Sequence, residues 1–493
     1  MAWMFNSFRM SMGWVHTWLG LVLGFVLMIC FFFGALSVFD REIDRWAIPD
    51  TRFEPQPMPS FDEVLKPAFD EMKPHPTDMA ATQQRVIGDL PDPDTMPLKS
   101  LYAYTTHRDP VLRIGGEFGI PNEPKDPADD HLHVHGWATV NPTTGETLSD
   151  SALKIGSDWF YPMHFNLHLR WNMLGYWIVG VAALVMLAAL VTGVIIHRKL
   201  FREFFTFRPW KHVLRSSLDL HNVTGVVALP FHFFFAFTAL VIFATNIYLP
   251  LSHTTLKPLH EQHEKLEAER TGLPHEESGV AAPLASIDAM VAEAKRRWAE
   301  RDMPGEVGYL FMDHIGDENS YVSIYRAGSD RVALVGEGIH FKASTGEVIR
   351  EEPPRSVVAS IDEFLTGLHL QHFEHWMLRW LYVFGGLLGA ICIATGFILF
   401  VEKRKARHAK AGSQGSRIVD AMAVTTVTGM VIAAVSMLVA NRILPADLAG
   451  KGQWEQSVFW WAWGLAFLHA AWRSSPVAKA RSNPAWREQS WVL

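Results

Sequence analysis

Histidines recur at matching places in the two halves of the chain, close to the ends of long apolar stretches. His16 and His221 each stand four residues before a glycine, and His168 and His369 each lie within a Leu-His-Leu triplet. Because polar side chains near lipid are costly, histidines that recur there indicate a function in the membrane. Further histidines flank the same stretches, namely His164, His197, His232, His372 and His375.

Histidine pairs between apolar helices are typical ligands of haem iron, which takes two axial ligands in an electron-transfer site. The sequence predicts two layers of ligands. One layer comprises His16, His197 and His221, and the other comprises His164, His168, His369, His372 and His375. A helix rises about 1.5 Å per residue, so His168 and His197 lie about 43 Å apart if one helix joins them. They cannot share a haem, and two stacked haems would carry electrons across the insulating core.

His232 allows two interpretations. It follows His221 by nearly three helical turns, so both histidines fall on one helix face. Pro230 predicts a kink just before it. His232 is either a ligand of the second haem or a hydrogen-bonded core residue. For the histidines at the membrane surface the alternative is a polar anchor, and His372 and His375 can belong instead to the surface or to a substrate site.

Apolar stretches free of charge indicate a mainly α-helical membrane protein with about six transmembrane helices. A bilayer core needs about 20 apolar residues to cross. The predicted spans are Trp14–Phe39, Trp171–Ile196, Val223–Leu249, Leu381–Val401 and Ala421–Ala440. Ser457–Trp472 is shorter and rich in tryptophan. We predict it as a sixth span, with an interfacial helix as the alternative.

Basic segments predict the orientation of these helices. Residues 197–215, residues 403–410 and the C-terminal tail are rich in Lys and Arg, and six crossings place all three on one side with Arg9. The first of them contains Arg198, Lys199, Arg202, Arg208, Lys211 and Arg215. Positive charge favours the cytoplasmic side, so we expect both termini there.

Two long acidic segments then face outward, and each has the pattern of a small α+β domain. Phe61–Met72 and Ser286–Arg301 are helix-like, whereas Ser320–Tyr325 and Gly338–Lys342 have strand character. Asn141–Glu146 returns as Lys342–Glu347, and the glycine in each predicts a tight turn with positive φ. The predicted order is a duplicated helix–domain–helix unit with these divisions: 1–40 with the first span, 41–170 as the first outer domain, 171–250 with two spans and the basic loop, 251–376 as the second outer domain, 377–402 as the fourth span, and 403–493 with the last two spans.

The absence of several sequence motifs excludes several kinds of binding site. Cys30 and Cys392 are the only cysteines, so a disulfide framework, a CxxC zinc site and covalent haem attachment are excluded. Without GxGxxG or a P-loop, no built-in nucleotide or flavin site is expected, and electrons must come from a separate reductase or from quinol. His131, His133 and His135 alternate along a predicted strand and suggest either a metal site or a solvated strand, and His253, His260 and His263 suggest plain surface.

The stretch from Gly193 to Phe237 carries a family resemblance. It includes His197-Arg198, the segment Phe204–Pro209 and the segment Leu218–Gly225. Over residues 10–405 the chain resembles the PepSY-associated transmembrane helix family of iron-regulated inner-membrane proteins. The resemblance implies two periplasmic PepSY-like domains, one or more b-type haems in the membrane, and reduction of a ferric siderophore or other ferric chelate in the periplasm. Phe400 stands where the repeat would place a counterpart of His197, so the two copies are not equivalent.

These observations predict a bacterial inner-membrane protein that holds two haems b. Its expected partners are a ferric chelate, a cytoplasmic reductase or quinol, and the lipid membrane, with no nucleic acid. One alternative is a non-redox PepSY protein that binds a partner or a metal in transport or regulation. Another is a proton- or metal-coupled transporter, which is weakened because the first four spans contain no Asp, Glu, Lys or Arg.

Overall fold

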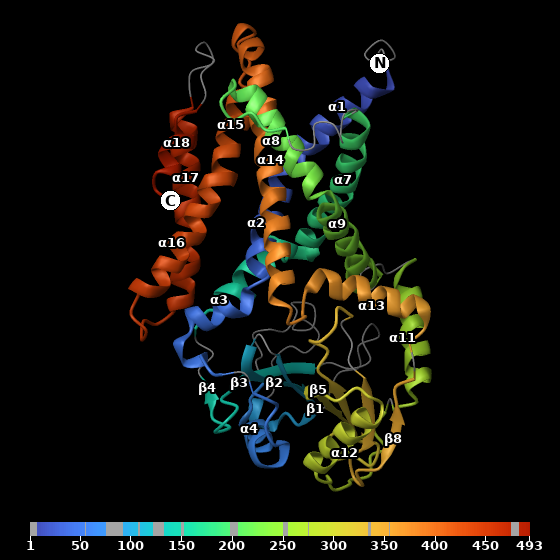
Figure 1. Ribbon diagram of the computed structural model, residues 1–493. Helices are drawn as coiled ribbons and strands as arrows, with labels where there is room; N and C mark the ends of the chain where they lie inside the picture. Colours follow the sequence, from blue (N-terminus) through green and yellow to red (C-terminus); the bar gives the residue numbers. More distant parts are fainter. Residues whose placement is uncertain are drawn as a thin grey trace. The chain divides into compact units, whose positions relative to one another are not determined.

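The chain forms two compact units in the computed structural model (Figure 1). The model describes residues 7–54, 56–74, 92–106, 109–121, 133–148, 152–197, 206–249, 255–274, 276–333, 337–353, 355–474 and 483–493. The helical unit comprises Met1–Ala47, Ser151–Tyr248 and His375–Leu493, and the sheet unit comprises Ile48–Asp150 and Leu249–Glu374. We describe each unit by itself.

Within the described residues, four helices of the helical unit are long and apolar enough to cross a membrane. They are Trp171–Ile196, which contains α7 (Leu174–Ile196); Leu229–Tyr248, which contains α9 (Leu229–Phe243) and η7 (Ala244–Tyr248); α14 (Trp376–Lys410); and Gly415–Ile443, which contains α15 (Gly415–Val424), η8 (Thr425–Gly429) and α16 (Met430–Ile443). Each contains or largely overlaps one predicted span. The chain is therefore a multi-pass membrane protein.

Two predicted spans are interrupted. The first divides into α1 (Phe8–Val22) and α2 (Gly24–Ser37), bent by 61°, and the pair counts as a fifth crossing if it forms one span. The third was predicted as one helix from Val223 to Leu249, but α8 (Val213–Val227) ends at Val227 and α9 begins at Leu229. Pro230 in the first turn of α9 lacks the amide hydrogen that a continuous helix needs, so the break falls where the proline predicted it.

The predicted sixth span lies in α17 (Lys451–Arg473), a continuous helix. It is not among the helices that are apolar enough to cross, and it contains Lys451, Glu455 and Arg473. The remaining helices of the unit are short: α3 (Asp40–Ala47), η5 (Ile155–Phe160), α6 (Tyr161–Phe165), η6 (Trp171–Met173) and α18 (Ala485–Ser490). Six crossings therefore stay a prediction.

Small residues let the helices around α14 approach closely. α14 packs against α2 and α8, while α1 packs against α7 and α7 against α9. A Cβ added at Gly389 would clash with the Phe31 ring, and one at Gly386 would lie 3.0 Å from Ala35. Without a strong hydrophobic drive between helices in lipid, such close van der Waals contact is what holds them together.

In the described part of the sheet unit, eight strands form an antiparallel sheet in the order β4-β3-β2-β1-β5-β6-β7-β8. The strands are β1 (Leu98–Thr106), β2 (Asp109–Gly119), β3 (His133–Val140), β4 (Thr147–Leu148), β5 (Val307–Asp313), β6 (Tyr321–Arg326), β7 (Gly338–Lys342) and β8 (Val348–Glu351). β1 and β5 pair with Leu101 opposite Met312 and Ala103 opposite Leu310. The two segments that the sequence presents as separate domains thus share one sheet.

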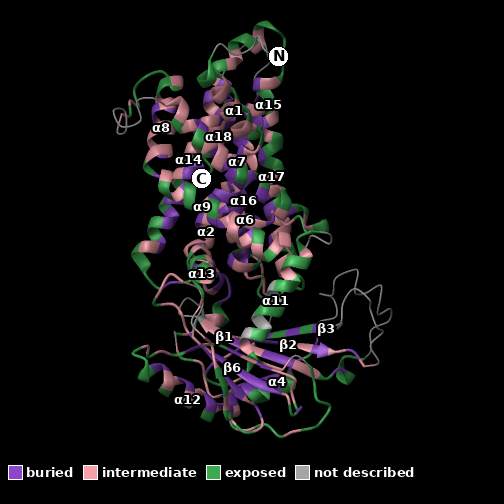
Figure 2. Cartoon of the chain, turned by 90° about the vertical axis from the view of Figure 1, so that its right-hand side faces the viewer, coloured by how far each residue is buried: buried purple, intermediate pink, exposed green. Residues whose placement is uncertain are grey.

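Helices cover one face of this sheet and close a single core (Figure 2). They are η2 (Phe61–Leu65) with α4 (Lys66–Glu71), and α12 (Ile287–Glu300), near the two predicted helices. Phe61, Leu65 and Trp298 are buried against strand residues from both segments. The unit also contains the short η1 (Pro49–Thr51) and η4 (Pro93–Thr95), and two longer helices, α11 (Lys257–Thr271) and α13 (Val357–Leu370).

The repeated Gly-Glu turns have the geometry that the sequence predicted. Gly145 and Gly346 both adopt positive φ, at 76° and 75°. In the first turn the Asn141 amide donates to the Glu146 carbonyl at 2.9 Å, and in the second the Lys342 amide donates to the Glu347 carbonyl at 2.8 Å. Each turn leads into the edge strand of its half, β4 or β8.

Candidate functional site

Two of the predicted histidines meet inside the helical unit. His16 of α1 and His221 of α8 have ring centroids 6.2 Å apart, with the ring planes at 86° to each other. Both side chains are partly buried among helices α1, α7, α8 and α14. The sequence placed them in the same layer, and the structure brings them into direct contact.

His16 is held against α7 by its Nδ1 atom. Nδ1 lies 3.0 Å from the carbonyl oxygen of Ala189 and 3.2 Å from Oγ1 of Thr192. A carbonyl can only accept, so Nδ1 carries the proton and Nε2 retains the lone pair that binds metals. The ring lies over Gly193, where an added Cβ would be 3.4 Å from Cε1.

His221 is held against α14 in the same way. Its Nδ1 lies 2.7 Å from the carbonyl oxygen of Cys392 and 3.4 Å from Oγ1 of Thr395. The ring lies over Gly396, where an added Cβ would be 3.5 Å from Cε1. The two Thr-Gly pairs that recur in the sequence are therefore the supports of two equivalent histidines. Hydrogen bonds of this kind fix the tautomer and orientation of metal-binding imidazoles.

The distance between the ring centroids of His16 and His221 is close to that of two imidazoles that bind one metal ion. An imidazole nitrogen binds a metal at about 2 Å, so two imidazoles on opposite sides of one ion have centroids about 6 Å apart. The His16 and His221 centroids, 6.2 Å apart, meet this requirement. Because a backbone carbonyl holds Nδ1 of each ring, Nε2 is the nitrogen of each ring that could bind a metal ion or haem iron.

His164 and His232 repeat the arrangement elsewhere in the unit. His164 Nδ1 lies 2.7 Å from the carbonyl oxygen of Cys30, and its ring lies against Gly34. His232, only 1% exposed, hydrogen-bonds the backbone of Gly385, and a Cβ added at Gly389 would lie 3.1 Å from its Nε2. In all four cases the histidine bonds the carbonyl of one residue and packs on a glycine four residues further along the helix.

His232 also carries an unsatisfied atom. Its Nε2 is buried and has no hydrogen-bond partner in the part of the chain that the structure describes. The Phe31 ring meets the imidazole edge to face at 5.5 Å. A buried polar atom without a partner costs free energy, which favours a bound group over the interpretation as a satisfied core residue.

The other predicted ligands do not share this arrangement of a carbonyl and a glycine in the contacts that are described. His197 is the C-cap of α7, and its place in one layer with His16 and His221 stays a prediction. His168 lies in a turn with φ of 55°, stacks on Trp159 at 4.2 Å and uses Nε2 to bond the Trp159 carbonyl. His369 and His372 belong to the sheet unit. Their pairing with His168 stays a prediction.

The two other groups of histidines lie mostly outside the described residues. Among the described residues, no cluster of three His, Cys, Asp or Glu side chains that would hold a metal ion occurs. His135 is exposed on β3, whereas His131, His253 and the side chains of His133 and His263 lie outside the described residues. His260 lies on α11.

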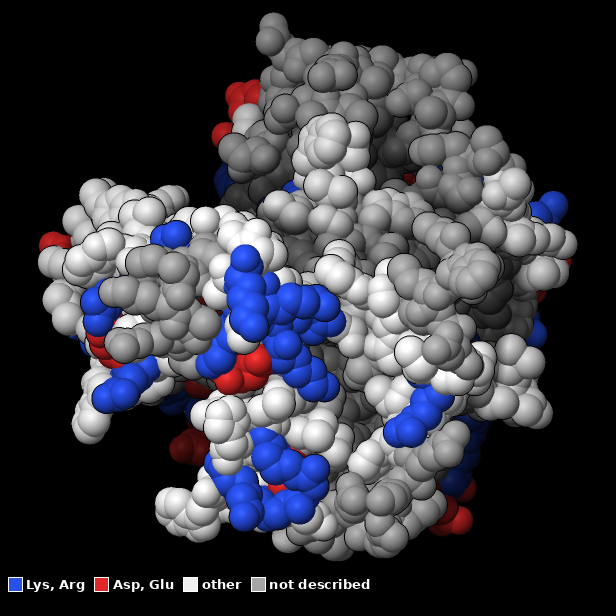
Figure 3. All heavy atoms as spheres, turned by 90° about the horizontal axis from the view of Figure 1, so that it is seen from above, with Lys and Arg blue, Asp and Glu red and all other residues white. Residues whose placement is uncertain are grey.

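Basic side chains gather at the end of the helical unit where α14 ends and α8 begins (Figure 3). Lys403, Arg404, Arg407 and Lys410 belong to the last two turns of α14. Arg208 and Arg215 are partly neutralised by Asp219, at 2.7 Å and 3.3 Å. Arg198, Lys199 and Arg202 of the predicted basic loop lie outside the described residues. Arg404 stacks over Phe400 at 4.0 Å, so this departure from the repeat has a packing role.

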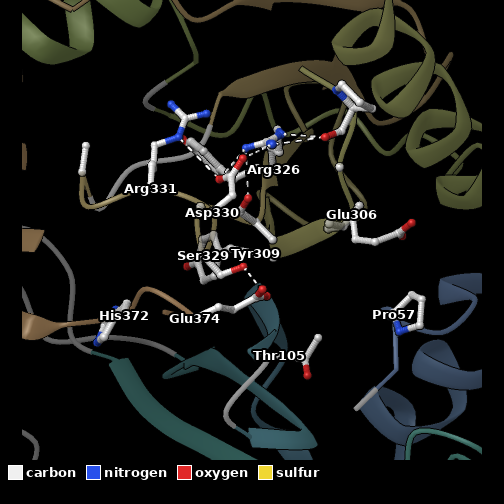
Figure 4. A pocket seen from close by; sticks show the side chains of 18 of the residues that line it. Pro57, Thr105, Glu306, Tyr309, Arg326, Ser329, Asp330, Arg331, His372 and Glu374 are labelled. Carbon is white, nitrogen blue, oxygen red and sulfur yellow. Dashed lines mark hydrogen bonds and ion pairs between the residues drawn. The ribbon is translucent and has the colours of Figure 1, made fainter. Parts of the chain in front are cut away.

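The sheet unit contains a cavity of about 870 Å³ (Figure 4). Its walls come from β5, β6, the loop after β6 and the segment that follows α13, which contributes His372 and Glu374. Tyr309 and Tyr325 contribute aromatic faces, with ring centroids 5.9 Å apart. Burial raises the pKa of Tyr309 to about 12, with smaller contributions from Tyr102, Glu117 and Tyr104, so this wall stays neutral.

Both arginines of the cavity wall are paired with carboxylates. Arg326 donates to Asp330 at 2.6 Å, and this bond lowers the pKa of the Asp330 carboxyl. Arg331 pairs with Glu337 at 2.8 Å, and Ser329 donates to Glu374 at 2.8 Å. The cavity therefore offers aromatic surface and hydrogen-bonding groups, and its volume is in the range of small-molecule sites.

Sequence comparison agrees with this architecture. The chain is 23% identical over 333 residues to an uncharacterized protein of Pseudomonas aeruginosa, a match that covers 62% of this chain and 78% of that protein. The family model for the PepSY-associated TM region matches residues 13–403, which include most of α1, both Thr-Gly pairs, the sheet unit and most of α14. The chain belongs to the family of proteins with the PepSY-associated transmembrane region.

Proposed function

We propose that this chain is a b-type haem protein of the bacterial inner membrane that carries electrons outward to reduce a ferric chelate. The observation that supports this most is the contact between His16 and His221, whose ring spacing and anchored Nδ1 atoms fit two axial ligands. A histidine pair that only anchored helices would not need both Nε2 atoms left available on adjacent rings.

His16 and His221 would hold one haem, and bound haem supplies reversible transfer of one electron. The chain's own contribution is to fix the tautomer of each imidazole through Ala189 and Cys392 and to surround the pair with apolar helices that exclude water. For a second haem, His164 and His232 share the same support, whereas the sequence favoured His168 with His369 or His372. We propose His164 and His232 as the first choice.

The proposed orientation places both termini and the basic end of α14 in the cytoplasm, with six crossings and a duplicated helix–domain–helix unit. The basic side chains support this, because positive charge favours the cytoplasmic side. A cytoplasmic reductase or quinol would supply the electrons. The periplasmic acceptor would be a ferric siderophore or another ferric chelate, bound at the cavity of the sheet unit. One electron converts Fe³⁺ to Fe²⁺, which hard oxygen ligands hold less tightly.

The first test is a visible spectrum of the purified full-length protein, oxidised and then reduced with dithionite, with haem quantified per chain. Two haems with a low-spin b-type spectrum are expected. One haem would keep the redox function but contradict the second site. A chain without haem after haem-replete expression would overturn the proposal in favour of a non-redox binding protein.

Alanine variants assign the ligands. We expect His16→Ala and His221→Ala each to lose one haem and the reduction of a ferric chelate, and His164→Ala and His232→Ala to lose the other. His168→Ala and His369→Ala test the pair predicted from the sequence, and exposed His135→Ala is the control. Retention of both haems in His16→Ala and in His221→Ala would contradict the assignment.

A further inference from the structure

Helix α13 of the sheet unit carries an uncovered apolar stripe. Val357, Val358, Ile361 and Phe364 are 77%, 76%, 54% and 47% exposed. Residues 357, 361 and 364 follow the spacing of one helix face, and Val358 flanks it. A helix that met only water on this side would carry polar residues there, so the stripe indicates a surface that something apolar covers.

The other side of α13 is charged or buried. Glu363 pairs with Arg355 at 2.8 Å, and Gly367 is buried. The helix is therefore amphipathic, and its apolar face is exposed. α13 contains no Lys or Arg, and Asp362 and Glu363 are its acidic residues. The open face therefore offers no Lys or Arg side chain to an acidic partner or to anionic headgroups.

The segment that follows α13 limits how far this helix can lie from a membrane-spanning helix. α13 ends at Leu370, and α14, which is long and apolar enough to cross a membrane, begins at Trp376. The short link between them spans roughly 20 Å when fully extended. α14 also begins with exposed Trp376, Met377 and Trp380, the kind of residues that occupy the boundary between lipid and water. The open stripe is thus tethered close to a bilayer surface.

We propose that α13 is an interfacial helix that lies in the surface of the bilayer, with Val357, Ile361 and Phe364 among the acyl chains. Burial of these side chains supplies the attachment, and no anionic lipid is required. The helix would hold the sheet unit against the membrane. This inference does not depend on haem or on the identity of the acceptor.

Spin labels on the full-length protein in phosphatidylcholine nanodiscs test the proposal. Ile361→Cys carries the label on the stripe, and Asp362→Cys, one residue further round the helix, is the matched control. Cys30 is buried and Cys392 is partly buried, so the unsubstituted protein serves as the labelling blank. We expect the label at position 361 to be reached more readily by oxygen than by a water-soluble nickel complex, with the reverse preference at 362.

Two results would overturn the proposal. Equal access of the nickel complex to both labels would show that water covers the stripe. Protection of the label at position 361 from oxygen as well as from nickel would show that protein covers it, either a second copy or another segment. Val357→Cys provides a second label on the stripe, so one poorly folded variant does not leave the question without an answer. Loss of haem would not affect either readout.

Discussion

At the residue scale, the four supported histidines differ in how much room their glycines leave. A Cβ added at Gly34 would lie 2.7 Å from Nδ1 of His164, whereas one at Gly193 would lie 3.4 Å from the His16 ring. We expect Gly34→Ala to displace His164 and to lower the free energy of unfolding by about 1–3 kcal/mol. Gly193→Ala is the matched control and should be tolerated. Thermal unfolding in detergent compares them, and equal midpoints would contradict the expectation.

A buried aspartate in the sheet unit makes its stability depend on pH. Asp317 accepts hydrogen bonds from the amides of Asn319, Ser278 and Gly279 at 2.7 to 2.9 Å. Burial alone would raise its pKa, but these bonds and one from the Ser278 hydroxyl outweigh it, and the pKa falls from 3.8 to about 2. The stabilisation is therefore complete above pH 4 and is lost as the pH falls toward 2.

Asp317→Asn should consequently destabilise the sheet unit at pH 7 and at pH 5 by the same amount, and by less at pH 3. Denaturant unfolding followed by circular dichroism measures the difference at each pH. Asp70→Asn is the control, because the exposed Asp70 carboxylate only pairs with Lys66 at the surface. A difference that does not change with pH would show that the hydrogen bonds, and not the charge, are responsible.

At the scale of elements, η2 and α12 cap each other. Asp62 accepts from the Ser286 hydroxyl at 2.6 Å and from the Ile287 amide at 3.3 Å. Asp288 accepts from the Ser60 hydroxyl and from the Phe61 amide at 2.7 Å. Ser60 and Ser286 also cap their own helices. The first turns of two helices from distant parts of the chain are therefore joined through one polar cluster.

This reciprocal cap predicts non-additive mutations. Asp62→Ala and Asp288→Ala should each lower the free energy of unfolding by about 1 kcal/mol, as lost helix caps do. The double variant should differ from the sum of the two by about 0.5 kcal/mol or more, because the residues belong to one network. Denaturant unfolding of all three variants completes the cycle. Strict additivity would show that the two caps act independently.

At the scale of the whole molecule, the β1–β5 pairing makes the two outer segments interdependent. Leu310 of β5 faces Ala103 of β1, and both side chains are fully buried in the shared core. Leu310→Asp places an unpaired charge there, so we expect β1–β4 to lose amide protection together with β5–β8. Hydrogen exchange on the full-length protein measures both sets. Tyr309→Ser, at a partly exposed position of the same strand, is the control.

Loss of protection in β5–β8 alone would show that the two segments fold separately despite the shared sheet. That outcome would agree with the division into two outer domains that the sequence suggests. The expected outcome instead follows from the core, in which Leu101 and Ile114 of the first segment pack with Leu310 and Val322 of the second. An unpaired charge in the middle of a shared core destabilises every strand that lines the core.

The sequence by itself determined the features that depend on local pattern. The span Trp171–Ile196 and the strand Gly338–Lys342 follow directly from apolar composition and from alternation. The positive φ of Gly145 and Gly346 follows from the repeated turn motif, and the break before α9 follows from Pro230. The relation of His16 to His221 was visible as a repeat, because both precede a glycine and both halves contain a Thr-Gly pair.

Only the tertiary structure decided which distant groups meet. The contact of His16 with His221 joins α1 to α8, two helices that are about 200 residues apart in the sequence. His164 and His232 are each supported by a carbonyl and a glycine on another helix. The sequence around either histidine does not predict which residues these are. Likewise, no local pattern shows that β1 pairs with β5. Such contacts depend on how helices and strands pack, which is set by side-chain shape across the whole core and not by periodicity within one segment.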